Sequence, residues 1–244
     1  MQTAMDRQSP RQRPPGRPLM YQRWLQLLFL HWPLPAAELA ALVPAPLELD
    51  LFDGQAWIGV VPFTMRRVRP RGLPALPGCS AFHELNVRTY VHYLGFPGVW
   101  FFSLDAANPL AVRAARWRFH LPYFDARMRL AAKGPEVAYD SLRTHRDAPF
   151  AAFRARWTFG QPLGEVAADS LEFFLTERYC LYACDGQRLW RARIHHPPWP
   201  LRRATLHELH SSMLEPLGLR PAAGAPHIAG AERIDVDIFP LERL

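Results

Sequence analysis

The sequence of 244 residues is poor in cysteine, in lysine and in long apolar runs. Its three cysteines are an odd number and give no disulfide framework. The longest apolar stretch, residues 25–30, is interrupted by Gln26 and is far shorter than the roughly 18–20 residues that cross a bilayer. We therefore expect a cytoplasmic protein with no membrane partner.

Sequence motifs that would name a reaction are also missing. There is no G-x-S-x-G nucleophile elbow, no phosphate-binding Walker loop and no G-x-G-x-x-G dinucleotide loop. His207 and His210 are three residues apart, one residue short of the spacing in HExxH zinc proteases. We therefore expect neither a metal ion nor a cofactor.

The formal charge of +7 comes almost entirely from arginine, since Lys133 is the single lysine. Residues 1–18 contribute a net +3 from four arginines and Asp6, which leaves +4 on the rest of the chain. The remaining arginines are scattered, and no nucleic-acid-binding motif accompanies them. We expect residues 1–18 to be a disordered Pro/Arg-rich tail whose arginines can be replaced without effect, and the scattered charge does not favour a nucleic-acid partner.

The rest of the chain, residues 19–244, is expected to form a single domain of short strands. The 25 prolines argue against long helices, because a proline inside a helix costs about 3 kcal/mol. Asp53-Gly54 and Asp185-Gly186 are hairpin turn signals, and residues 82–93 give the clearest alternating strand. Short helices are expected at 19–28, 35–43, 106–117 and 169–176, and a last strand at 233–239. The predicted fold is α+β, mainly antiparallel, closed or nearly closed into a β-barrel with a few short flanking helices.

The strand at 82–93 carries the most informative polar residues. Glu84, Asn86 and Arg88 fall on one face of it, because side chains alternate along a strand. This face is either the solvent side of a sheet or the wall of a cavity inside the barrel. In the second case Glu84 and Arg88 should be paired, since burying either charge alone is costly. The other face, with Leu85 and Val87, should pack between the barrel and the helices.

Several stretches of the sequence resemble a known family. The most specific are Asn-Val-Arg-Thr-Tyr-Val at 86–91 and Phe-Phe-Ser-Leu at 101–104. Supporting stretches are Phe-Leu-His-Trp at 29–32, Asp-Gly-Gln-Ala-Trp-Ile-Gly at 53–59, Ala-Arg-Trp-Arg-Phe-His-Leu-Pro-Tyr at 115–123, Thr-Glu-Arg-Tyr at 176–179 and His-Pro-Pro-Trp-Pro-Leu at 196–201. The chain resembles the YqjF-like family of uncharacterised bacterial proteins, which is similar in fold to acetoacetate decarboxylase.

The resemblance implies a barrel with an internal cavity and suggests the residues of its site. Acetoacetate decarboxylase forms a Schiff base on a lysine, and Tyr123 stands where that lysine is expected. A phenol cannot form an imine, so the resemblance does not carry this reaction over. Glu84 matches the active-site glutamate of the decarboxylase, and Arg88 and Arg116 would supply positive charge. His31 is a further candidate ligand-binding residue.

We therefore expect a polar cavity that binds a small organic acid or carbonyl compound. Glu84 and Tyr123 are the candidates for acid–base chemistry without Schiff-base decarboxylation, and Asn86, Arg88, Arg116 and His31 are the candidate ligand-binding residues. Two alternatives stay open, namely a non-catalytic sensor or carrier of a small ligand, and a module that binds a protein or nucleic acid through its basic surface. The sequence also leaves homo-oligomerisation open.

Overall fold

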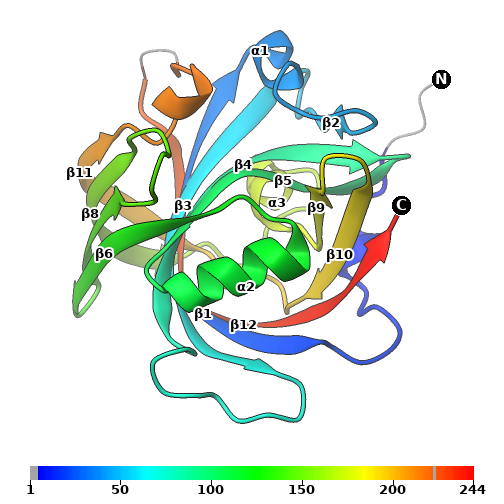
Figure 1. Cartoon of the computed structure of the whole chain (residues 1–244). Helices are drawn as coiled ribbons and strands as arrows, with labels where there is room; N and C mark the ends of the chain where they lie inside the picture. The colour runs from blue at the N-terminus through cyan, green and yellow to red at the C-terminus, as the bar shows by residue number, and fades with distance from the viewer. Residues whose placement is uncertain (1–4, 222–223) are drawn as a thin grey trace.

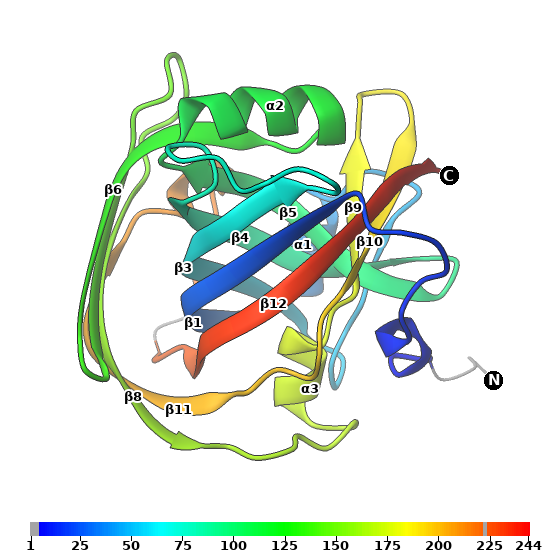
Figure 2. The same cartoon turned by 90° about the horizontal axis from the view of Figure 1, so that it is seen from below.

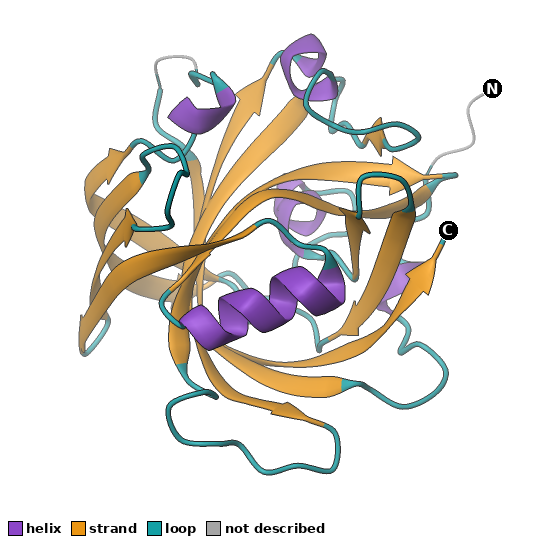
Figure 3. Cartoon of the chain, viewed as in Figure 1, coloured by secondary structure: helices purple, strands orange, loops and turns teal. Residues whose placement is uncertain are grey.

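The computed structural model describes residues 5–221 and 224–244, and strands make up most of it (Figure 3). The strands are β1 (Met20–Leu34), β2 (Glu48–Leu49), β3 (Ala56–Pro70), β4 (Phe82–Tyr93), β5 (Phe96–Ala106), β6 (Tyr123–Lys133), β7 (Glu136–Arg143), β8 (Ala152–Pro162), β9 (Cys180–Cys184), β10 (Leu189–His195), β11 (Arg202–Ser211) and β12 (His227–Arg243). The helices are α1 (Ala36–Ala40), α2 (Pro109–Phe119) and α3 (Leu171–Thr176), with 3-10 turns η1 (Ser9–Arg11) and η2 (Glu215–Leu217).

All the strands belong to one 12-stranded sheet that closes on itself. The pairings run β10–β9–β5–β4–β3–β1–β12 and return from β12 to β10, which makes a ring (Figure 1). Strands β6, β7, β8 and β11 extend the sheet from β5 back to β12 on the other side. The only parallel pairings within the described chain are those of β5 with β6 and with β9. The prediction of a mainly antiparallel α+β fold is confirmed.

Strand β1 separates two hydrophobic cores and is buried on both faces along its second half. Leu27 and Phe29 pack into the core inside the ring, whereas Leu28 and Leu30 pack into the core under β6–β8. A strand buried on both faces has no polar alternation, so its sequence is a continuous apolar run. The prediction of a helix over residues 19–28 was wrong, because β1 already begins at Met20; this first half is only partly buried, and its pairing with β3 is irregular, so it shows no regular alternation of polar and apolar residues.

Strand β4 has the predicted bounds, Phe82–Tyr93. Leu85 and Val87 are fully buried in the second core, where they share a cluster with Met128 and Trp157 of β6 and β8. The prediction that these side chains pack against helices holds only for α1, whose Leu39 belongs to this cluster. Most of the cluster comes from another part of the same sheet, which curls back to cover the outside of the ring.

Helices α2 and α3 lie toward opposite ends of the ring (Figure 2). Asn108 caps α2, since its Oδ1 accepts hydrogen bonds from the Leu110 and Ala111 amides at 3.1 and 3.2 Å. The predicted helices at 106–117 and 169–176 are confirmed with shifted bounds, and Ser170 caps α3 by accepting a hydrogen bond from the Phe173 amide. In the described residues no helix combines the length and the apolar character needed to cross a bilayer.

The segment before β1 is packed against the sheet over residues 5–18. Pro10 in η1 is buried, and Arg193 of β10 donates hydrogen bonds to the carbonyls of Pro10 and Gln12. Arg7 forms an ion pair with the buried carboxylate of Asp50. The expected disordered tail at 1–18 thus differs from the structure over residues 5–18, because its arginines find acceptors on the sheet. Residues 1–4 lie outside the described part of the chain.

Candidate functional site

The ring encloses a cavity of about 660 Å³, within the usual range for small-ligand sites. Its walls come from β1, β3, β4, β5 and α2, from the loop after β3, and from residues in and next to β9 and β10. Most of the lining is apolar, with the rings of Phe29, Phe63 and Phe101 among the largest groups. The polar side chains of the buried wall are those of Glu84, Asn86, Arg88, Tyr123, Thr176, Arg178 and His196.

Glu84 and Tyr123 meet in this cavity. α2 ends at His120, whose left-handed backbone (φ 54°) turns the chain, and β6 begins at Tyr123. The Tyr123 hydroxyl donates a hydrogen bond of 2.9 Å to Oε2 of Glu84. From the opposite face of β4, the Tyr139 hydroxyl donates to the Glu84 carbonyl oxygen at 2.9 Å. The carboxyl group is thus held by one tyrosine and its backbone by another.

Burial changes the protonation of this pair. It raises the pKa of Glu84 to about 8, the charge of Asp105 adds to the rise, and hydrogen bonds from Tyr123 and Asn86 oppose it. Burial and the neighbouring Glu84 raise the pKa of Tyr123 well above its ordinary value. Tyr123 therefore remains a donor, and Glu84 is largely a neutral acid at pH 7 that can exchange a proton near neutrality.

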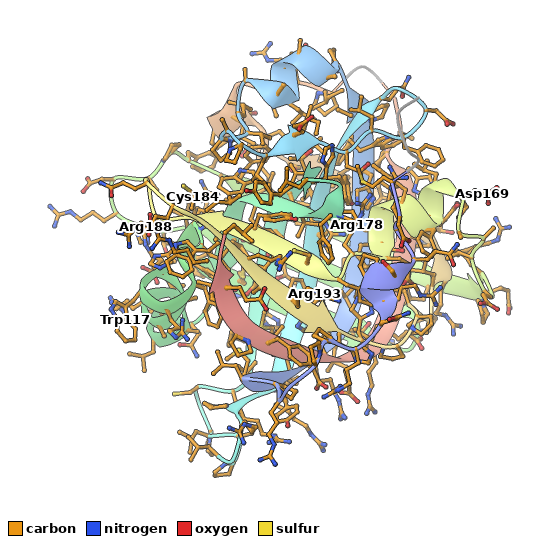
Figure 4. All side chains as sticks on the ribbon, turned by 90° about the vertical axis from the view of Figure 1, so that its right-hand side faces the viewer. Trp117, Asp169, Arg178, Cys184, Arg188 and Arg193 are labelled. Atoms are coloured by element: carbon orange, nitrogen blue, oxygen red, sulfur yellow. The ribbon has the colours of Figure 1, made fainter. Side chains whose placement is uncertain are left out.

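Two arginines lie at the α3 end of the cavity, both close to the ring of Tyr90. The guanidinium carbon of Arg88 is 5.7 Å from the centre of the Tyr90 ring, and that of Arg178 is 4.8 Å from it. Arg88 donates to the Leu175 carbonyl at 3.1 Å, and Arg178 donates to the Phe174 carbonyl at 2.7 Å. The last carbonyls of α3, which have no acceptor role inside the helix, thus bind both arginines. Figure 4 shows Arg178 beside α3.

The two arginines differ in their acidic partners. Arg178 forms a buried ion pair of 2.6 Å with Asp50, and Asp50 also binds Arg7. Burial alone would raise the pKa of Asp50, but Arg178 and Arg7 lower it below its ordinary value. No acidic side chain of the described residues forms an ion pair with Arg88, although Arg88 is only 8% exposed.

The predicted pair between Glu84 and Arg88 is therefore wrong. Both side chains line the cavity, as the alternation along β4 predicted. Four residues of strand separate their backbones by about 13 Å, however, and a register shift between Val87 and Arg88 interrupts the pairing with β5. Glu84 binds Tyr123 toward the α2 end, and Arg88 binds Leu175 toward the α3 end.

Several buried polar atoms of the cavity wall have no hydrogen-bond partner in the described chain. They are Oδ1 of Asn86, Nε of Arg88, Nη2 of Arg178, Nε2 of His196 and Nε1 of Trp199. Buried polar groups are normally satisfied, because leaving one unpaired costs about 1–3 kcal/mol. Two arginines and one tryptophan of one cavity wall thus carry unpaired donors, and an anionic ligand in the cavity would supply negative charge beside them.

His31 lies behind the cavity wall rather than on it. Its Nε2 is 2.6 Å from the Tyr90 hydroxyl, which itself donates to the Leu175 carbonyl at 2.7 Å. Burial and the charge of Arg88 lower the pKa of His31 well below its ordinary value, which favours the neutral ring. Because the Tyr90 hydroxyl uses its one proton for the Leu175 carbonyl, Nε2 of His31 is the donor to Tyr90. A Cβ at Gly59 would lie 2.8 Å from the His31 ring, so only glycine fits there. His31 positions Tyr90 and does not reach a ligand directly.

Arg116 is outside the cavity, in contrast to the prediction. It is on the exposed side of α2, where it donates to the Tyr123 carbonyl at 2.9 Å and contacts His145 at 3.1 Å. The helix turns this side chain toward the start of β6, so Arg116 braces the backbone of Tyr123. The cavity residues that the sequence reasoning missed are Arg178, His196 and Trp199. The only sequence signal for these three residues is that they lie in the stretches at 176–179 and 196–201, which carry the family resemblance.

Comparisons with known proteins agree with this architecture. The profile of DUF2071, described as an uncharacterized conserved protein, matches residues 21–235. The chain is 42% identical over 230 residues to the uncharacterized protein YqjF of Bacillus subtilis (strain 168), with 94% of each chain covered.

Similar solved structures share the fold at low identity. The enduracididine biosynthesis enzyme MppR complexed with pyruvate has a TM-score of 0.68 at 12% identity, covering 94% of this chain and 91% of that one. An acetoacetate decarboxylase-like enzyme from Sphingomonas wittichii RW1 has a TM-score of 0.65 at 14% identity, with 94% of each chain covered.

Proposed function

Since the chain belongs to the DUF2071 family and has an acetoacetate decarboxylase-like fold, we propose that its cavity binds a small organic acid and moves a proton on it without a Schiff base. The observation that carries this proposal is Arg88, a buried cation with no carboxylate partner among the described residues. A buried charge is normally compensated, and an anionic ligand would compensate this one. The carboxylate of the ligand would bind the guanidinium groups of Arg88 and Arg178. The related fold of MppR is known with pyruvate, which is itself a small keto acid.

Glu84 and Tyr123 would act on the part of the ligand that extends from the arginines toward α2. Ionised Glu84 would remove a proton from the carbon next to a carbonyl group, and the Tyr123 hydroxyl would hydrogen-bond to the enolate oxygen that forms. Return of the proton leaves Glu84 in its starting state. A pKa of about 8 suits a group that must both accept and release a proton near neutral pH.

An imine route has little support from the residues of this site. The single lysine, Lys133, is at the exposed end of β6, and no lysine lines the cavity. Tyr123 hydrogen-bonds to Glu84 and offers no amine. The proposed chemistry is therefore proton transfer between the ligand and a carboxyl group, with the arginines holding the acid.

Isotope exchange tests this proposal. Levulinate, a ketone with a carboxylate, is incubated with the protein in D₂O, and NMR follows loss of the protons next to the ketone. We expect binding by calorimetry and exchange faster than in buffer, with binding lost in Arg88→Met and exchange alone lost in Glu84→Gln. Binding without exchange would indicate a carrier or sensor, and no binding of levulinate or other small carboxylates would overturn the proposal.

A further inference from the structure

The α2 end of the cavity is bordered by exposed apolar side chains. Trp117 and Leu110 of α2 are 80% and 64% exposed, and Leu73 and Leu76 of the loop after β3 are also exposed. All four belong to the cavity lining, so the cavity reaches the surface between α2 and this loop. Figure 4 shows Trp117 projecting outward from α2. We call these four residues the apolar rim.

The apolar rim is a fixed part of the fold. The Asn108 side chain, which caps α2, also donates a hydrogen bond of 3.1 Å to the Gly78 carbonyl and so ties the loop to the helix. Single exposed leucines are common on proteins, but a group of them around the opening of a cavity marks a site for an apolar ligand or partner.

The opposite end of the same cavity is closed and cationic. Thr176, Arg178 and Cys180 are buried there, and Arg88 has no acidic partner within the described residues. Between the two ends the wall is apolar, with Phe29 and Phe101 among its members. At the rim Arg118 is a charged lining residue, and its positive charge favours entry of an anion.

From this gradient we infer that the natural ligand is an amphiphilic monocarboxylate, whose acid group binds the arginines near α3 and whose apolar body extends to the apolar rim. The inference rests on the proposed carboxylate-binding function and names the class of ligand. A cavity of about 660 Å³ has room for roughly twenty water volumes, so a molecule as small as pyruvate would fill only a small part of it. An aliphatic or aromatic tail would replace that water against an apolar wall.

A chain-length series tests the inference. Calorimetry with the full chain compares butyrate, hexanoate and octanoate at concentrations where the acids are monomeric, with octanol and octylamine as uncharged and cationic counterparts. Each added methylene should tighten binding about fourfold, which corresponds to burial of one methylene group. Octanol and octylamine should bind far more weakly than octanoate.

The possible results separate the two proposals. Equal affinity for all three acids would overturn the amphiphilic ligand and leave carboxylate binding intact. Equal binding of octanoate and octanol would show that the arginines do not recognise the acid, and failure of every carboxylate to bind would overturn both proposals.

Rim variants provide a second readout in a region where folding is not at stake. Leu110→Gln and Trp117→Gln should weaken octanoate binding severalfold and leave butyrate unchanged, because only the longer tail reaches the rim. Leu94→Gln is the matched control, since Leu94 is 85% exposed and lies outside the cavity lining. Unchanged octanoate affinity in both rim variants would overturn the inference. If these variants also lost self-association, the apolar rim would be an interface between copies of the chain.

Discussion

The Tyr123 hydroxyl donates a 2.9 Å hydrogen bond to Glu84 inside the ring, and both side chains are buried. This tyrosine stands where the family resemblance places the lysine of the decarboxylase. The hydrogen bond keeps Glu84 at the cavity surface but does not compensate its charge. The folded protein consequently favours the neutral form of Glu84, and this has a measurable effect on stability.

Glu84→Gln should make unfolding less dependent on pH. The pKa of Glu84 rises from an ordinary 4.5 to about 8 on folding, so its stabilising contribution is complete below pH 4.5 and is lost as pH rises toward 8. At pH 9 the variant should be more stable than the wild type by on the order of 4 kcal/mol, with little difference at pH 4.5. Urea denaturation across this range measures it, with the exposed Glu48→Gln as control. Parallel stability profiles for wild type and Glu84→Gln would contradict the prediction.

Replacing each of the two cavity arginines by methionine should have different effects on the free energy of unfolding. Arg178→Met leaves Asp50 buried with only Arg7, and removing one partner of a buried ion pair is expected to cost about 3 kcal/mol. Arg88→Met removes a buried charge that has no acidic partner, and the Leu175 carbonyl keeps its hydrogen bond from Tyr90. The free energy of unfolding should then be unchanged or higher. Denaturant titration compares the two variants. An equal loss of stability in both would show that the charge of Arg88 is compensated within the folded protein.

The sequence predicted strand β4 and the cavity-facing side of it well. A period of two is visible at 82–93 because polar side chains line the cavity on one face and apolar ones fill a core on the other. The same rule failed for the first half of β1, where the pairing with β3 is irregular and the side chains are only partly buried. Strand β11 was not predicted at all, because its residues are half-exposed and its strand form depends on pairing with β8, some 50 residues earlier in the chain.

The candidate site was predictable only where it depends on local pattern. Glu84, Asn86 and Arg88 share one strand, so alternation places them together. Arg178 is one arginine among many in this sequence, and its partner Asp50 is 128 residues away. No local pattern predicts that contact. The expectation for Arg116 was wrong because the direction of its side chain depends on where α2 ends. The helix ends before Tyr123, and Arg116 points outward to the Tyr123 carbonyl.

Borohydride trapping should detect no imine. With acetoacetate present, peptide mapping of the wild-type protein should find no side-chain adduct, because Lys133 is exposed at the end of β6 and no lysine lines the cavity. Tyr123→Lys is the informative comparison, since it puts an amine beside Glu84 in a desolvated site and should form an adduct. An adduct on Lys133 in the wild type would restore Schiff-base chemistry as a route for this protein.

Arg7→Ala should be destabilising, in contrast to the sequence-based expectation that arginine changes within residues 1–18 have no effect. Arg7 binds the carboxylate of Asp50, which also holds Arg178 at the cavity, and its guanidinium lies 5.3 Å from the centre of the Phe174 ring. Loss of a hydrogen-bonded partner of a buried charge should cost about 2 kcal/mol.

The affinity for carboxylates should fall as well. Without Arg7, the Asp50 carboxylate that holds Arg178 loses one of its two arginine partners. Arg17→Ala is the matched control, since Arg17 is exposed and forms no ion pair with any residue in the described ranges. Thermal unfolding and calorimetric titration with butyrate measure the two effects. If Arg7→Ala and Arg17→Ala behave alike in both assays, the segment before β1 makes no contribution to the site. If only Arg7→Ala loses stability and affinity, the segment is part of the structure that holds the cavity arginine in place.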